Sequence, residues 1–169
     1  SRLLRSRRHL GIPRAFPAVA IPAAAVGALI IIIIIIISPT TSTGNDDNTT
    51  PPVRFMVANA EALPFPDASF DCVVDTFSLC VIENPLAALQ EVRRVLRPGG
   101  RALLIEHSKS TVVPLLGAYQ DLTGPAVTKL AKGCAWNQDV LGLAKTAGLT
   151  VVKAEPSLLG VLTTLELKP

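Results

Sequence analysis

The feature that most constrains this chain is a strand–helix–strand pattern between Phe70 and His107. Phe70 to Phe77 form a short run rich in β-branched and aromatic residues, which is typical of a strand covered on both faces. Ala102 to Ile105 form a second apolar run of the same kind. A crossover of this length joins parallel strands, so the pattern predicts an α/β fold built on a parallel sheet.

The segment between the two strands has the start and stop signals of an amphipathic helix. Asn84 offers a side-chain acceptor to free N–H groups, and Pro85 suits the first helical position because it has no N–H to leave unpaired. Pro98, Gly99 and Gly100 predict the turn that ends it. Five apolar residues then share one helical face, namely Leu86, Leu89, Val92, Val95 and Leu96.

Polar residues follow both predicted strands. They lie in the segments Asp75 to Ser78 and Glu106 to Ser108. Ligands bind at the carboxyl ends of the strands in open parallel sheets, so these two segments mark the expected functional edge.

Short motifs along this stretch closely resemble the middle of the class I S-adenosylmethionine-dependent methyltransferases, the group that includes ubiquinone and menaquinone biosynthesis methyltransferases. The motifs are Asn59–Ala60, Leu63 to Phe65, Ser69 to Asp71, Asn84–Pro85 and Arg94 to Gly100. Two later segments, Leu104 to Ser108 and Gly133 to Asp139, are similar to a membrane-anchored branch of methyltransferase-like proteins. The resemblance runs from Val53 to the end and implies a Rossmann-like sheet with S-adenosylmethionine as cofactor.

The chain departs from the family pattern before Val53. Class I methyltransferases place two strands there, with a Gly-rich loop after the first and an acidic residue after the second. The sequence contains no GxGxG motif, since Gly11, Gly27 and Gly44 are isolated. About half of the cofactor site is therefore missing from the pattern, and we expect the chain alone to bind S-adenosylmethionine weakly.

The resemblance also assigns candidate cofactor-binding residues. Asn59, Ala60 and Glu61 correspond to residues beside the adenine, although they also suit an ordinary strand-to-loop turn. Thr76 and Phe77 correspond to residues beside the methionine part.

Three further residues have candidate roles in or near the site. His107 is a candidate catalytic base, because an imidazole can take a proton near neutral pH, but a histidine at a strand end also serves as a structural hydrogen-bonding group. Asp71 is interpreted as structural. Asp75 could face the cleft or cap a helix, and the sequence does not decide between these roles.

The N-terminal third differs in composition from the rest. Residues 1–17 are basic and suit either a targeting segment or the flank of an anchor. Ala18 to Ile37 is an uncharged apolar run of about 20 residues, the length that crosses a bilayer, and predicts a transmembrane helix. A low-complexity isoleucine tract is the alternative. Residues 38–52 are predicted to be a linker and residues 53–169 the C-terminal part of a methyltransferase domain.

Charge and cysteine usage exclude other classes. From Asp46 onward there are 11 basic and 13 acidic residues, because five of the 16 basic residues precede it, so nothing favours nucleic acid as a partner. Three widely spaced cysteines without a CxxC pair argue against a disulfide framework or a zinc site and are interpreted as buried apolar thiols. The basic N-terminus favours a mitochondrial membrane, with the endoplasmic reticulum or a plastid membrane as alternatives.

The remaining segments predict the completion of the sheet. Val53 to Ala58 is a strand candidate, and Val112 to Ala131 is expected to be a broken helical region because prolines interrupt it. Asn137 to Ala147 predicts a helix that ends at Gly148. Two closing strands, Thr150 to Ala154 and Val161 to Leu167, are expected to pair antiparallel.

Two functions remain open from the sequence alone. The first is a membrane-anchored methyltransferase that acts on a small or lipid-like acceptor. The second is a truncated or non-catalytic methyltransferase-like membrane protein.

Overall fold

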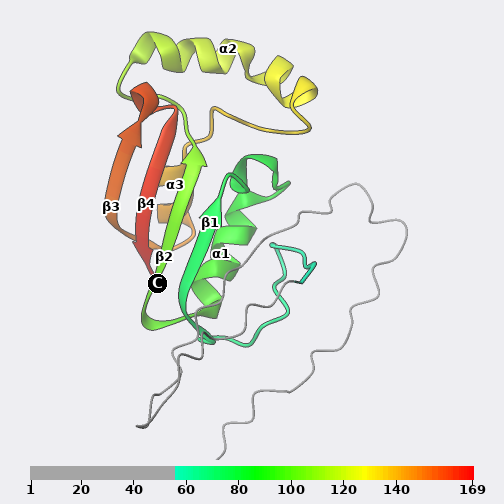
Figure 1. The fold of residues 1–169 in the computed structure, drawn as a ribbon, viewed down its shortest axis with the longest axis vertical. Coiled ribbons are helices and arrows are strands. Elements are labelled where there is room, and N and C mark those ends of the chain that lie inside the picture. The colour runs from blue at the N-terminus through cyan, green and yellow to red at the C-terminus, as the bar shows by residue number, and fades with distance from the viewer. Residues whose placement is uncertain (1–55) are drawn as a thin grey trace, which may run out of the picture.

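A computed structural model describes residues 56–169, which form a four-stranded sheet with helices on one face and a further helix beyond one end (Figure 1). In chain order the elements are β1 (Phe70–Thr76), the 3-10 turn η2 (Leu79–Val81), α1 (Pro85–Val95), β2 (Leu96–His107), α2 (Pro114–Leu130), α3 (Val140–Thr146), β3 (Thr150–Ser157), the 3-10 turn η3 (Leu158–Gly160) and β4 (Leu162–Lys168).

The sheet has the strand order β1-β2-β4-β3. β1 pairs parallel with β2, whereas β4 pairs antiparallel with both β2 and β3. The predicted parallel pair and the antiparallel closing strands are therefore confirmed, and the α/β fold class with them.

Helix α1 begins as its sequence predicts. The Asn84 side chain accepts a hydrogen bond from the Ala87 N–H, and Pro85 occupies the first helical position. Leu89 and Val95 on its inner face are buried against the sheet. The helix ends at Val95 because Leu96 already has extended backbone geometry.

The predicted turn at Pro98 to Gly100 is found inside the first part of β2. Pairing with β1 jumps from Phe70 opposite Leu96 to Cys72 opposite Arg101, so the intervening residues bulge out of the ladder. Gly99 has φ +86°, a conformation that a residue without a Cβ adopts readily.

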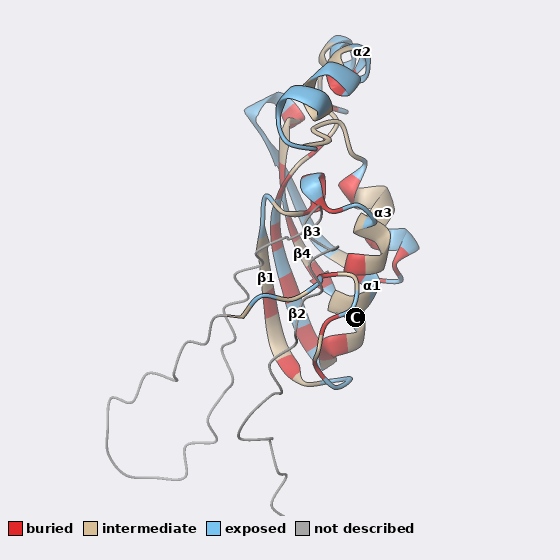
Figure 2. Ribbon diagram, turned by 90° about the vertical axis from the view of Figure 1, so that its right-hand side faces the viewer, coloured by how far each residue is buried: buried red, intermediate tan, exposed pale blue. Residues whose placement is uncertain are grey.

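Both α1 and α3 pack on the same face of the sheet (Figure 2). Ala102 and Leu104 of β2 point toward that face and are buried, while Leu103 and Ile105 point the other way and are 38% and 39% exposed. The expectation of strands buried on both faces is therefore wrong for residues 56–169, because the described helices cover only one side.

Helix α2 is continuous rather than broken, which corrects the expectation for Val112 to Ala131. Pro125 lies inside it, and a proline there can keep helical φ while the helix loses one hydrogen bond. α2 lies beyond the carboxyl end of β2 (Figure 1). The fully buried Gln120 attaches it there by donating to the carbonyls of Ser108 and Trp136.

Helix α3 starts at Val140, later than the predicted Asn137, and Asp139 caps it by accepting the Gly142 N–H at 2.9 Å. Gly148 has φ +81° just after the helix, which confirms the predicted stop.

Residues 56–58 form no strand, so this part of the predicted strand Val53 to Ala58 is wrong. They lie in an irregular segment that leads into the turn at Asn59 to Glu61. The rest of that strand, the predicted anchor Ala18 to Ile37 and the linker lie outside the described residues. Within residues 56–169, every helix is too short or too polar to span a bilayer.

Candidate functional site

The carboxyl ends of β1 and β2 bring two acidic residues together, as the parallel pairing requires. Asp75 and Glu106 both contact the backbone turn that follows β1. The Ser78 hydroxyl donates to Asp75 Oδ1, and the Ser78 N–H donates to Glu106 Oε1 at 3.0 Å. Glu106 is fully buried, and its Oε2 has no N–H or O–H donor among the described residues.

Burial favours the protonated form of both acids. Burial, and then the neighbouring Asp75, raise the pKa of Glu106 to about 8, and burial also raises the pKa of Asp75. Two adjacent carboxyl groups away from water cannot both ionise readily. The environment therefore favours the protonated form of Glu106 at neutral pH.

The predicted adenine-side residues lie on one turn before β1. Asn59 Oδ1 accepts the Glu61 N–H, and Glu61 Oε1 accepts the Asn84 N–H, each at 2.9 Å. Ala60 is buried in the core. The polar oxygens of Asn59 and Glu61 thus shape the turn and tie it to the start of α1.

An arginine of α1 fixes the segment that follows this turn. Arg94 donates to the carbonyls of Leu63 and Phe65 at 3.1 and 2.8 Å, and to both oxygens of Glu91 at 2.7 Å. Glu91 in turn accepts the Leu63 N–H at 2.8 Å. Hydrogen bonding to Arg94 lowers the pKa of Glu91 and keeps it ionised. The two motifs therefore contact each other, since Arg94 begins one of them and binds the other, Leu63 to Phe65.

The predicted methionine-side residues are exposed at the end of β1. Thr76 is exposed, and Phe77 is 46% exposed with φ +55°, a strained conformation for a non-glycine residue. The Phe77 ring packs against the His107 ring with centroids 5.1 Å apart. The structure thus brings Phe77 and the candidate base His107 together, whereas Asn59 to Glu61 lie on a separate turn.

Asp71 and Asp75 have different environments. Asp71 forms an ion pair with Arg97 at 2.8 Å, in agreement with a structural role. Asp75 faces the pocket between β1 and α1, together with Ala60 and Ser78. This pocket has a volume of about 30 Å³. Sites for cofactor-sized ligands usually measure about 300–1,000 Å³, so the pocket cannot enclose S-adenosylmethionine by itself.

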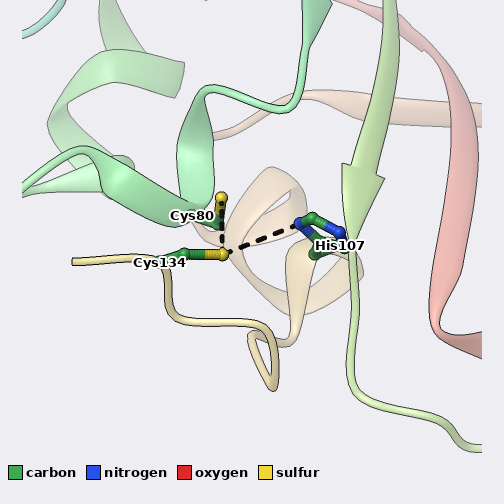
Figure 3. A group of neighbouring side chains, drawn as sticks. All are labelled: Cys80, His107 and Cys134. Atoms are coloured by element: carbon green, nitrogen blue, oxygen red, sulfur yellow. Dashed lines mark hydrogen bonds between the residues drawn. The ribbon is translucent and has the colours of Figure 1, made fainter. Parts of the chain in front are cut away.

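One group of residues could not be identified from the sequence. Cys80 of η2, His107 of β2 and Cys134 of the loop after α2 converge at the edge where the strands end (Figure 3). The two cysteines are 54 positions apart, and the loop after α2 brings them together, with the Ala135 N–H donating to the Cys80 carbonyl. Burial, followed by the neighbouring Cys134, raises the pKa of the Cys80 thiol to about 12.

Comparison with known proteins agrees with the motifs. The sequence profile of the family described as "Methyltransferase domain" matches residues 20–104. The ubiquinone/menaquinone biosynthesis C-methyltransferase UbiE of Hahella chejuensis is 58% identical over 67 residues, and that of Citrobacter koseri is 49% identical over the same length. Each alignment covers 40% of this chain and 27% of the relative, so the chain spans about a quarter of the length of these proteins.

A solved structure shares the fold. A SAM-dependent methyltransferase from Methanosarcina mazei superposes with a TM-score of 0.52 at 23% identity, covering 75% of this chain and 72% of that one. At this identity the likeness concerns the arrangement of strands and helices. The four-stranded sheet of residues 56–169 therefore has the topology of part of a class I methyltransferase sheet.

Proposed function

Since this chain belongs to the methyltransferase domain family, we propose that it is an S-adenosylmethionine-dependent methyltransferase, tethered to a membrane, that acts on a small quinone-like or lipid-like acceptor. The observation that carries the proposal is the family match over residues 20–104, which spans half of the chain. The acceptor class comes from the UbiE relatives. The membrane tether comes from the apolar run Ala18 to Ile37.

The described residues fit the cofactor in part. Thr76 and Phe77 are exposed beside the two acidic residues, where the methionine part would lie. Asn59 and Glu61 would approach the adenine through the turn they shape, since their side-chain oxygens already accept backbone N–H groups. When bound, S-adenosylmethionine supplies a methyl group on a positively charged sulfur.

Residues of this chain would position the acceptor and accept the proton that it loses. Asp75 and Glu106 hold the turn at Ser78 and so fix the end of β1 relative to β2. His107 is half-buried at the end of β2, where its imidazole could accept a proton from the acceptor. α2 would exclude water from this edge, since it lies beyond the end of β2 (Figure 1).

The alternative is a non-catalytic methyltransferase-like membrane protein, and the absence of a GxGxG motif from the sequence favours it. Isothermal titration of the full chain in detergent with S-adenosylmethionine, followed by transfer of a labelled methyl group to a demethylated quinone, separates the two. Saturable binding and label in the quinone support the enzyme. Binding no tighter than that of a heat-denatured control, with no label transferred at raised cofactor concentration, supports the alternative and refutes the proposal.

A further inference from the structure

Three side chains with metal-binding atoms meet at the edge where the strands end. The Cys134 and Cys80 Sγ atoms are 3.2 Å apart, and Cys134 Sγ lies 3.8 Å from His107 Nδ1. One ligand atom from each residue lies within 4.8 Å of the other two (Figure 3). All three residues are buried or half-buried, and both cysteines are free thiols.

Three hydrogen bonds that do not involve the thiols hold the segments around this group in place. The Ala135 N–H donates to the Cys80 carbonyl at 2.7 Å, which joins the loop after α2 to η2. The Gln138 side chain donates to the Leu79 carbonyl at 3.2 Å, and Thr128 donates to the Cys134 carbonyl at 3.2 Å. Because β2 itself supplies His107, the three ligand atoms come from segments whose relative positions are already fixed.

We propose that Cys80, His107 and Cys134 bind one zinc ion and leave its fourth coordination position open. Two sulfurs and one imidazole nitrogen form a ligand set that selects zinc over magnesium or calcium, and three protein ligands with one open position are typical of reactive rather than structural zinc sites. Around tetrahedral zinc, sulfurs bound at about 2.3 Å lie about 3.8 Å apart, so the two sulfurs would separate by about half an ångström.

A Cys80–Cys134 disulfide is the competing use of the same thiols. A disulfide would join only the two cysteines and would leave His107 without a role, although its imidazole lies within 4.8 Å of both sulfurs. A zinc ion uses all three groups. The open position lies at the carboxyl edge of the sheet, so it could hold a water molecule or a heteroatom of a bound acceptor. A zinc-bound His107 would have no free nitrogen to act as the base proposed above, so zinc binding and that role of His107 exclude each other. Binding of S-adenosylmethionine and methyl transfer are separate from zinc binding, and either can fail without the other.

The test uses the purified full chain in detergent, reduced and freed of metal. Cobalt(II) is added as a spectroscopic substitute, and zinc is then added in competition. We expect one cobalt per chain, a sulfur-to-cobalt charge-transfer band and the intense visible bands of tetrahedral cobalt, all abolished by zinc. The absence of these bands from the reduced wild-type chain would overturn the proposal without any variant.

Single substitutions identify the ligands. Cys80→Ser, Cys134→Ser and His107→Gln should each weaken zinc binding by about 100-fold or more, since even the loss of a partner outside the ligand sphere costs 10–100-fold. Cys72→Ser is the matched control, because Cys72 lies on β1 and is absent from the group. Equal weakening by Cys72→Ser would refute the assignment. So would a Cys80–Cys134 disulfide, found by alkylation and mass spectrometry, that zinc does not prevent from forming.

Discussion

The contact between Arg94 and the segment before β1 leads to a quantitative prediction. The guanidinium makes five hydrogen bonds: two to Glu91, one to Asp67 and one each to the carbonyls of Leu63 and Phe65. Arg94→Ala removes all five and leaves Glu91 without its cation. The segment from Leu63 to Phe65 should then separate from α1 and loosen the turn that carries the adenine-side residues.

The size of the effect follows from the exposure of each partner. The Asp67 side chain is 78% exposed, so its ion pair contributes close to nothing. A hydrogen bond from a charged group contributes about 1.5–3 kcal/mol, and the two carbonyl contacts at the lower value give about 3 kcal/mol. The Glu91 side chain is 18% exposed and keeps the Leu63 N–H, so losing the cation adds about 1 kcal/mol. We expect Arg94→Ala to lower the free energy of unfolding by about 3–4 kcal/mol.

Urea unfolding of the full chain in detergent, followed by circular dichroism, measures the difference. Arg93→Ala is the matched control, because Arg93 is the adjacent residue of α1 and is exposed. Hydrogen exchange at the Leu63 amide gives a local readout, since that N–H is protected only while Glu91 accepts it. A loss below about 1 kcal/mol, equal to that of the control, would refute the reasoning.

Three other predictions concern separate features of the chain. Hydrogen bonding to Arg94 lowers the folded-state pKa of Glu91, so the stabilisation from ionised Glu91 is complete above the unfolded pKa of about 4.3 and is lost as the pH falls through the folded-state pKa. In urea titrations, the difference in unfolding free energy between wild type and Glu91→Gln should therefore shrink below about pH 4. A difference that widens there would contradict this prediction. Gln120→Leu removes three hydrogen bonds from a fully buried side chain and should lower the free energy of unfolding by about 3 kcal/mol or more. Leu122→Ala, at an 81% exposed position of the same helix, is the control and should cost less than about 0.5 kcal/mol. Equal costs would show that Gln120 does not anchor α2. If Ala18 to Ile37 anchors the chain, the protein should stay with membranes through carbonate extraction, and its release would refute the anchor.

The sequence predicted the elements whose signals are local. Asn84 and Pro85 define the start of α1 whatever surrounds them, and Gly148 ends α3 because it can adopt a positive φ. The continuity of α2 depended on tertiary packing instead. Gln120 ties that helix to the carbonyls of Ser108 and Trp136, and these contacts have no counterpart in the local sequence pattern.

Only the part of the candidate site that comes from one continuous stretch of sequence could be predicted. The edge of the sheet followed from the ends of two strands, so Asp75 and Glu106 could be placed there in advance. The raised pKa of each follows from burial that no sequence pattern displays. The approach of Cys134 to Cys80 depends on where the loop after α2 meets η2. That long-range geometry has no local signal.

The two outer strands of the described sheet differ in how they would behave in a concentrated solution. The outer strand β3 carries Lys153, Glu155 and Pro156 and has a register shift, which are features that prevent a second molecule from adding a strand. β1 is the opposite edge among residues 56–169, and its sequence FDCVVDT has no lysine and no proline. No other segment of residues 56–169 pairs with its outer edge, so in a chain reduced to these residues the N–H and C=O groups there would form a template for another extended segment. A preparation reduced to residues 56–169 should therefore self-associate through the edge of β1. The edge of β3 should not pair with a second molecule.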